Sequence, residues 1–232
     1  MDFAPLIDGT SATIVLGGTA LATVLRSGPK ELAQTARALA ALFRPRFSAE
    51  QAKADLAGQV SAIRRDGVLR VNPRPIGDRE FDEATDALIR SRSLDPLVDR
   101  HHTYRRARLA QANVAVRTFA QAAELGPVFG MVGTLVSLSG LPADGLDPAA
   151  LNGAISMAVV TTLYGLLLAN IVLAPIARVI ERQAQAEEQA RQDVIDWLTR
   201  QLEPALPYSA PSLREVGGPA PRANPQRERQ HA

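Results

Sequence analysis

Apolar and charged positions in this chain are separated into long blocks. The longest apolar block contains two stretches, residues 125–143 and 148–177, that lack Asp, Glu, Lys, Arg and His. About 20 apolar residues are enough for a helix to cross the roughly 30 Å hydrocarbon core of a bilayer. The pattern therefore predicts a hairpin of two membrane-spanning helices joined by a short external turn at residues 144–147. The second of these stretches is longer than a bilayer requires, so its helix should project beyond the membrane.

An earlier apolar block, residues 9–25, predicts another membrane span behind a short external N-terminal tail at residues 1–8. The adjacent Gly17 and Gly18 suit close packing of this helix against another one. A buried helix of a soluble protein is the alternative interpretation. The charges favour the membrane, because aspartates precede the block and basic residues follow it at Arg26, Lys30, Arg37, Arg44 and Arg46.

Basic residues also flank the hairpin on one side only. Arginines precede the second predicted span and follow the third, whereas the N-terminal tail and the turn at 144–147 contain no Lys or Arg. Positively charged flanks remain in the cytoplasm. The expected topology is three spans with the N-terminus outside and the C-terminus inside.

The charged blocks read as helices, and strand-like alternation is lacking, so the fold class is all-α. We expect a helical cytoplasmic domain at 26–124, a cytoplasmic helix at 178–203 and a proline-rich disordered tail at 204–232. Within the domain, Ser48 and Gln51 form a capping-box pattern for a helix that Gly67 would end. Residues 71–80 predict a loop. A long helix should follow Asp95 as its N-cap, with Pro96 at its first position.

Composition excludes several classes of function. The net charge of +2 is too small to indicate nucleic acid binding, and the absence of cysteine removes disulfides and thiolate metal sites. Of the three histidines, His101 and His102 are adjacent, which is poor spacing for a metal. We find no nucleophile–base set and no phosphate loop, so we expect neither an enzyme nor a cofactor.

The predicted hairpin offers hydroxyl groups but no acid. An intramembrane ion path normally needs an ionisable group, which this chain cannot supply by itself. Thr134 in the second span and Thr162 in the third, with its neighbour Thr161, lie near the same depth and could line a path around a carboxylate from another chain. Alternatively, each hydroxyl simply bonds to a carbonyl of its own helix.

Small residues and prolines mark the hairpin ends and its seam. Gly126, Gly130 and Gly133 form a small-residue face that permits close helix packing. Pro127 and Pro175 lie towards the cytoplasmic ends of the two spans, where they could act as hinges that couple the pore to the inner domain. The plainer alternative is that the prolines only mark helix ends.

Three blocks of this sequence together resemble the MotA/TolQ/ExbB proton-channel family, and its MotA branch most closely. The blocks are LIDGTSATIVLGGTALATVLRSGP from Leu6, GPVFGMVGTLVSL from Gly126 and AISMAVVTTLYGLLLANIVLAPIARVIE from Ala154. The likeness covers residues 6–46 and 120–185 well, and the middle more loosely. It implies a bacterial inner-membrane protein.

The resemblance also implies an assembly and residue roles. It implies a pentamer around the membrane helices of a MotB-, ExbD- or TolR-like partner that supplies an ion-carrying aspartate. Thr134 and Thr162 match the hydroxyls facing that aspartate, and Pro127 and Pro175 match the coupling prolines. Arg64 matches a cytoplasmic position that contacts a rotor in flagellar stators, but the acidic counterpart of that position is Asn72 here.

The function that we expect is an ion channel subunit, for protons or sodium, that converts ion flow into mechanical work as a stator. The family's MotA proteins have an additional N-terminal span, and three spans is the ExbB/TolQ arrangement. An ExbB/TolQ-like energiser of envelope transport therefore stays open, as does a non-conducting membrane scaffold.

Overall fold

The computed structural model describes residues 8–70, 75–141 and 147–206 of the 232-residue chain. All regular structure in these ranges is helical, as the sequence predicts. The expected N-terminal tail, external turn and C-terminal tail lie largely outside the described residues. In chain order the helices are α1 (Gly9–Ala12), the π-helical η2 (Thr13–Gly17), α2 (Gly18–Arg26), α3 (Pro29–Ala41), α4 (Ala49–Asp66), the 3-10 helix η3 (Val68–Arg70), α5 (Arg79–Ser91), α6 (Asp95–Ser139), α7 (Pro148–Leu167), the π-helical η4 (Leu168–Leu173), α8 (Ala174–Leu202) and the 3-10 helix η5 (Glu203–Ala205).

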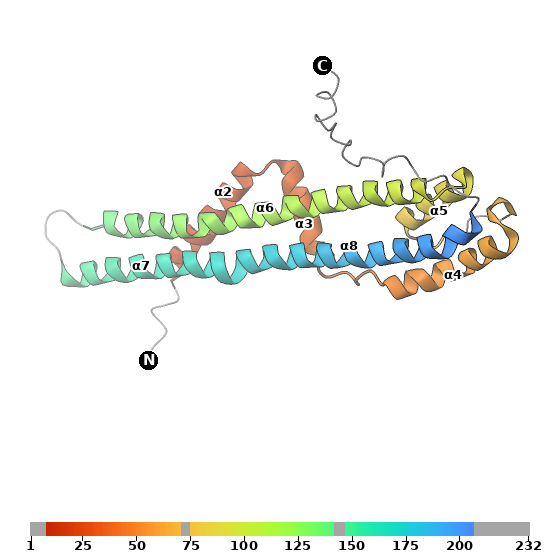
Figure 1. Ribbon diagram of the computed structural model, residues 1–232. Helices are drawn as coiled ribbons and strands as arrows, with labels where there is room; N and C mark the ends of the chain where they lie inside the picture. The colour runs from red at the N-terminus through yellow and green to blue at the C-terminus, as the bar shows by residue number, and fades with distance from the viewer. Residues whose placement is uncertain (1–7, 71–74, 142–146, 207–232) are drawn as a thin grey trace, which may run out of the picture.

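Two antiparallel rods dominate the molecule. One rod is α6, whose 45 residues correspond to a length of roughly 70 Å. The other is the continuous run of α7, η4 and α8, and Figure 1 shows it beside α6 over most of that length. The shorter helices pack onto this hairpin: α2 and α3 contact α6 in its middle part, and α4 and α5 surround its far end.

The helix starts follow from local sequence signals. The Ser48 hydroxyl accepts a hydrogen bond from the Gln51 backbone N–H at 3.3 Å, as the capping-box pattern predicts. The Gln51 side chain donates instead to Asp55 at 3.0 Å, so only half of the box forms. Gly67 ends α4 with a φ of +76°, a conformation that strongly favours glycine.

Two boundaries differ from the sequence-based expectation. The Asp78 carboxylate caps α5 by accepting from the Glu80 N–H at 3.0 Å, so the helix begins inside the predicted loop of residues 71–80. Helix α6 includes Asp95, which we expected to be its cap. The cap position belongs to Leu94, because the Asp95 side chain instead accepts from the Ser93 hydroxyl at 3.1 Å.

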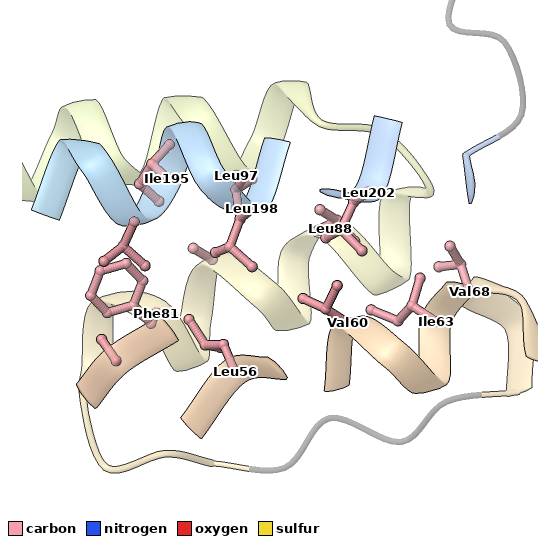
Figure 2. Close-up of a cluster of buried hydrophobic side chains, with 13 residues drawn as sticks. Leu56, Val60, Ile63, Val68, Phe81, Leu88, Leu97, Ile195, Leu198 and Leu202 are labelled. Atoms are coloured by element: carbon pink, nitrogen blue, oxygen red, sulfur yellow. The ribbon is translucent and has the colours of Figure 1, made fainter. Parts of the chain in front are cut away.

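The far end of the hairpin is a conventional hydrophobic core that we call the base. Side chains from α4, α5, the start of α6 and the end of α8 converge there (Figure 2). Phe81, Leu88 and Leu97 are completely buried. The Phe47 and Phe81 rings stack with their centroids 5.8 Å apart. The base therefore holds the start of α6 and the end of α8 together in one hydrophobic core.

Candidate functional site

The upper hairpin, α6 from residue 125 onward with α7 and η4, packs along a seam of small residues. Gly126, Gly130 and Gly133 are all buried on the face of α6 that meets α7. A Cβ atom built on Gly126 would lie 2.8 Å from the Gly165 carbonyl oxygen. A Cβ on Gly133 would lie 2.7 Å from the Thr161 Cβ. The backbones therefore approach so closely that no larger side chain fits without movement.

The first apolar segment packs against the hairpin through one of its two adjacent glycines. A Cβ on Gly18 would lie 2.2 Å from the Phe129 ring, whereas a Cβ on Gly17 would meet nothing within 4 Å. Of the two glycines that we expected to permit close helix packing, only Gly18 lies at such a contact.

The three threonines singled out from the sequence occupy different environments. Thr161 is completely buried against α6, at the level of Gly133. Thr134 and Thr162 remain partly exposed on the hairpin. In this single chain, therefore, Thr161 is enclosed in the seam, and Thr134 and Thr162 are the two hydroxyl positions open to a neighbouring molecule.

Thr134 and Thr162 lie within about one helical turn of the same depth. A Cβ on Gly130 would lie 3.3 Å from the Thr162 Cα, so these two residues are level. Thr134 follows Gly130 by four residues, which is about 6 Å along the helix. The register of the hairpin therefore brings together two residues that are far apart in sequence.

Each of these hydroxyls donates to its own helix, as one of the two sequence-based interpretations anticipated. The Thr134 Oγ1 donates to the Met131 carbonyl at 2.6 Å, and the Thr162 Oγ1 donates to the Ala158 carbonyl at 3.1 Å. A hydroxyl that donates its proton keeps its lone pairs as acceptors. These intrahelical bonds therefore leave both oxygens able to accept from an external donor.

The two prolines lie at different depths and in different helical contexts. Pro127 lies within the continuous helix α6, next to the Gly126–Gly165 contact. Pro175 lies about ten residues beyond Gly165, so it is roughly 15 Å nearer the base. It is the second residue after the π-helical segment η4. A proline ring clashes with the carbonyl four residues before it, and a wider π turn relieves that clash.

Below the seam, a buried charged network, which we call the stalk network, joins α5, α6 and α8. The Arg108 guanidinium donates to both oxygens of Glu188, one of them at 2.8 Å, and also to Glu80. The completely buried His101 contacts Glu80 through Nδ1 at 2.6 Å and Gln192 through Nε2 at 2.9 Å. Because both rods contribute to it, the network couples them mechanically outside the hydrophobic base.

Burial and pairing act in opposite directions on the charges of the stalk network. Burial alone raises the pKa of Glu80, but hydrogen bonds from His101 and Arg108 and the charges of Arg108 and Arg191 outweigh it, so this pKa lies below its ordinary value. Burial likewise disfavours the charged form of Arg108. Its bonds to Glu188 and Glu80 raise the pKa of Arg108 above its ordinary value. Glu80 and Arg108 are therefore both ionised at neutral pH.

The sequence analysis did not single out this network or Gly165. The sequence did contain an indication of the network. Glu188 lies at helical spacing from Ala177, Ile180 and Ile195, so it falls on the buried face of α8. A carboxylate on a buried stripe requires a partner, and Arg108 was the unrecognised one. Gly165 lies in the block from Ala154 that resembles the family, but sequence alone does not show which glycine faces the seam.

Arg64 lies on the surface near the C-terminal end of α4, far from the hydroxyls. Its guanidinium donates to the Gln201 side chain at 3.0 Å. It is therefore available on the outer surface of the base, and the structure does not bring it to the hairpin.

The upper hairpin exposes a large apolar surface. Two helical runs among the described residues, Asp95–Ser139 and Pro148–Ala205, are long and apolar enough to cross a bilayer. Their side chains are not those of a soluble core, because Leu135, Val159 and Ile171 are 68%, 62% and 66% exposed. The apolar surface continues onto α2, where Leu25 is 77% exposed. A contiguous exposed surface of this kind indicates lipid or a neighbouring protein.

The fold and the site define a class: an all-helical membrane protein with a glycine-packed hairpin that extends into a charged helical stalk. Residues 81–193 match the model of the MotA/TolQ/ExbB proton channel family. Over this part the chain is similar to that family, and it is MotA-like.

Individual relatives agree with this assignment. The chain is 28% identical over 196 residues to "Motility protein A" of Cereibacter sphaeroides, an alignment that covers 84% of this chain and 78% of the relative. It is 27% identical over 203 residues to "Chemotaxis protein PomA" of Vibrio alginolyticus, covering 82% and 76%. The fold matches a solved structure of the flagellar MotAB stator complex from Bacillus subtilis with a TM-score of 0.76, at 21% identity, covering 87% of this chain and 81% of that one.

Proposed function

We propose that this chain is the channel-forming subunit of a bacterial stator that converts a flow of protons or sodium ions into mechanical work. The observation that carries the proposal is the placement of two partly exposed hydroxyls, Thr134 and Thr162, at nearly one depth of a hairpin without acidic groups. The match to the MotA/TolQ/ExbB family model and the similarity to motility proteins support it. No catalytic chemistry is needed for this role.

In the proposed assembly, five copies surround the single membrane helices of a two-copy MotB-, ExbD- or TolR-like partner. The partner contributes the ion-carrying aspartate that the hairpin lacks. The assembly lies in the inner membrane, with three spans per copy, the N-terminus outside and the C-terminus in the cytoplasm. The exposed apolar side chains of α2, α6 and α7 support this placement in the membrane.

The mechanism follows from what the hydroxyls can do. Because each already donates to its own helix, each presents an acceptor oxygen, which pairs with a protonated carboxylic acid. The neutral acid prefers this hydroxyl surface, whereas the ionised acid avoids the surrounding apolar helices. Loading and release of the proton then change the preferred contacts of the partner. A membrane potential of 100 mV supplies about 2.3 kcal/mol per charge for each such step.

The remaining candidate residues serve force transmission in this proposal. Pro127 and Pro175, about three turns apart, let the pore helices bend at two levels above the stalk network. The network transfers that bending to the base. Arg64, on the outer surface of the base, is the proposed contact with a rotor.

The test of the proposal is Thr162→Val, with Thr162→Ser as its matched control. The chain is expressed with its own partner, and ion uptake into vesicles is measured together with ion-driven work in cells. We expect Thr162→Val to abolish both while the complex still assembles, and Thr162→Ser to retain both because it restores the acceptor oxygen. Normal ion uptake by an assembled Thr162→Val complex would contradict the pore role.

A further inference from the structure

A cavity of about 850 Å³ lies beside the stalk, below the inner end of the upper hairpin. Its walls come from α3, the linker between α3 and α4 at residues 42–48, α6 and α8. Part of its lining is apolar, from Ala38, Leu42, Leu109, Ala112 and Ile180. The volume is within the range of sites that enclose a small organic molecule.

Arginine dominates the charged lining of this cavity, which we call the arginine cavity. Six arginines and two glutamates contribute to it. Both glutamates are already used, because Glu188 pairs with Arg108 and Glu187 pairs with Arg191. Further carboxylates, Asp78 among them, also neutralise Arg191.

The other arginines of the cavity have no such partners. They are exposed, and none of them forms an ion pair within the part of the chain that the structure describes; they are Arg37, Arg44, Arg46 and Arg182. The cavity therefore carries a surplus of positive charge that is available to an external anion.

The position of the cavity points to the membrane as the source of that anion. One wall of the cavity is α3, which begins at Pro29, soon after the first predicted span ends at residue 25, and Figure 1 shows α3 running across the direction of the rods. The cavity therefore lies close to the cytoplasmic surface of the membrane. Val179 is 49% exposed, so an apolar surface faces outward at this level.

An exposed aromatic residue on the linker supports the same placement. Phe43 is 87% exposed and directly precedes Arg44. Exposure of a phenylalanine ring to water is unfavourable. At a membrane interface the ring can contact the apolar layer while the neighbouring basic side chain stays in the headgroup region. The linker that forms one wall of the cavity therefore has the composition of a membrane-contacting segment.

We propose that the arginine cavity binds an anionic phospholipid of the cytoplasmic leaflet. The unpaired guanidinium groups recognise its phosphate, and the apolar lining covers part of its acyl chain. A free phosphate would occupy only a small part of the volume and would leave the apolar lining unused. The bound lipid would join α3 to both rods. This inference depends on the proposed membrane orientation but not on ion conduction.

The test uses the full-length complex, purified in detergent, delipidated and titrated with phosphatidylglycerol or phosphatidylcholine, with bound lipids counted by native mass spectrometry. We expect tight binding of phosphatidylglycerol only. Arg44→Gln combined with Arg182→Gln should weaken it roughly thirtyfold, since each basic residue near an anionic surface contributes about a factor of five. The matched control is Arg105→Gln with Arg106→Gln, which removes the same charge from exposed positions of α6 outside the cavity and should change the affinity less than twofold.

Three results would overturn the proposal. If the control pair weakens phosphatidylglycerol binding equally, binding follows the overall charge of the protein. If phosphatidylcholine binds as tightly as phosphatidylglycerol, the net negative charge of the lipid plays no part in recognition. Inorganic phosphate that displaces phosphatidylglycerol at equal concentration would assign the cavity to a soluble anion. Since lipid counting needs no ion flow, a failed lipid test with normal ion uptake leaves the stator function intact.

Discussion

Gly165 lies so close to Gly126 that a Cβ atom on Gly165 would stand 2.5 Å from the Gly126 carbonyl oxygen. Real Cβ atoms do not approach an oxygen this closely, so the contact holds the α6 and α7 backbones at the minimum separation. Pro127 and Thr162 both lie within one turn of it. The position of the proposed ion path thus depends on one contact between two residues without side chains.

We expect Gly165→Ala to separate the two helices and to lower the thermal stability of the complex. Overpacking of this kind costs about 1–3 kcal/mol. The matched control is Gly153→Ala in the same helix, where a Cβ would meet nothing within 4 Å. Thermal unfolding of both purified variants measures the difference, and an unchanged midpoint for Gly165→Ala would show that the seam is loosely packed.

Replacement of Pro127 by alanine should impair coupling more than conduction. Alanine restores the backbone N–H and removes the ring that limits α6, so the helix becomes straighter and stiffer at the seam. We expect ion uptake at near normal levels but strongly reduced mechanical output, measured in vesicles and in cells respectively. If the variant fails to insert or to oligomerise, the proline is structural and the hinge role is wrong.

Truncation of the stalk network should be costly, because it removes charge compensation from a largely buried arginine. Glu188→Gln removes one of the two carboxylate partners of Arg108 and leaves Glu80 as the other. Loss of one member of a buried pair costs about 3–5 kcal/mol. We expect a loss near the lower of these values, because the Arg108 side chain is 25% exposed to solvent. The matched control is Glu187→Gln, which should cost less than about 1 kcal/mol because the Glu187 side chain is 38% exposed. Chemical unfolding distinguishes the two, and similar losses would refute the special position of Glu188.

Acid should weaken the same network through Glu80. Its pKa in the folded protein is below its ordinary value of 4.5, so its contribution to stability is complete above pH 4.5. That contribution is lost as the pH falls through 4.5 towards the lower folded value. Thermal unfolding between pH 6 and 3.5 should therefore show a steep decline that is shallower in Glu80→Gln. Parallel pH profiles for the two proteins would argue against this assignment of the pKa shift.

Much of the fold could be predicted from the sequence, because long charge-free stretches, capping residues and helix-breaking prolines act locally. The start of α4 at Ser48 and its end at Gly67 are examples, since each depends on only a few adjacent residues. The start of α5 was missed, because Asp78 was counted with the prolines and glycine of a loop rather than as a helix cap.

By itself the sequence determined the chemistry of the hairpin: which stretches can enter a membrane, which hydroxyls they carry, and that they lack an acid. Only the tertiary structure decided the register between α6 and α7. That register encloses Thr161, leaves Thr134 and Thr162 open at nearly one depth, and opposes Gly126 to Gly165. It also joined Arg108 to Glu188 and left four other arginines of the cavity without an ion pair among the described residues. The reason is physical, since composition and periodicity act along one helix, whereas register depends on contacts between residues far apart in the chain.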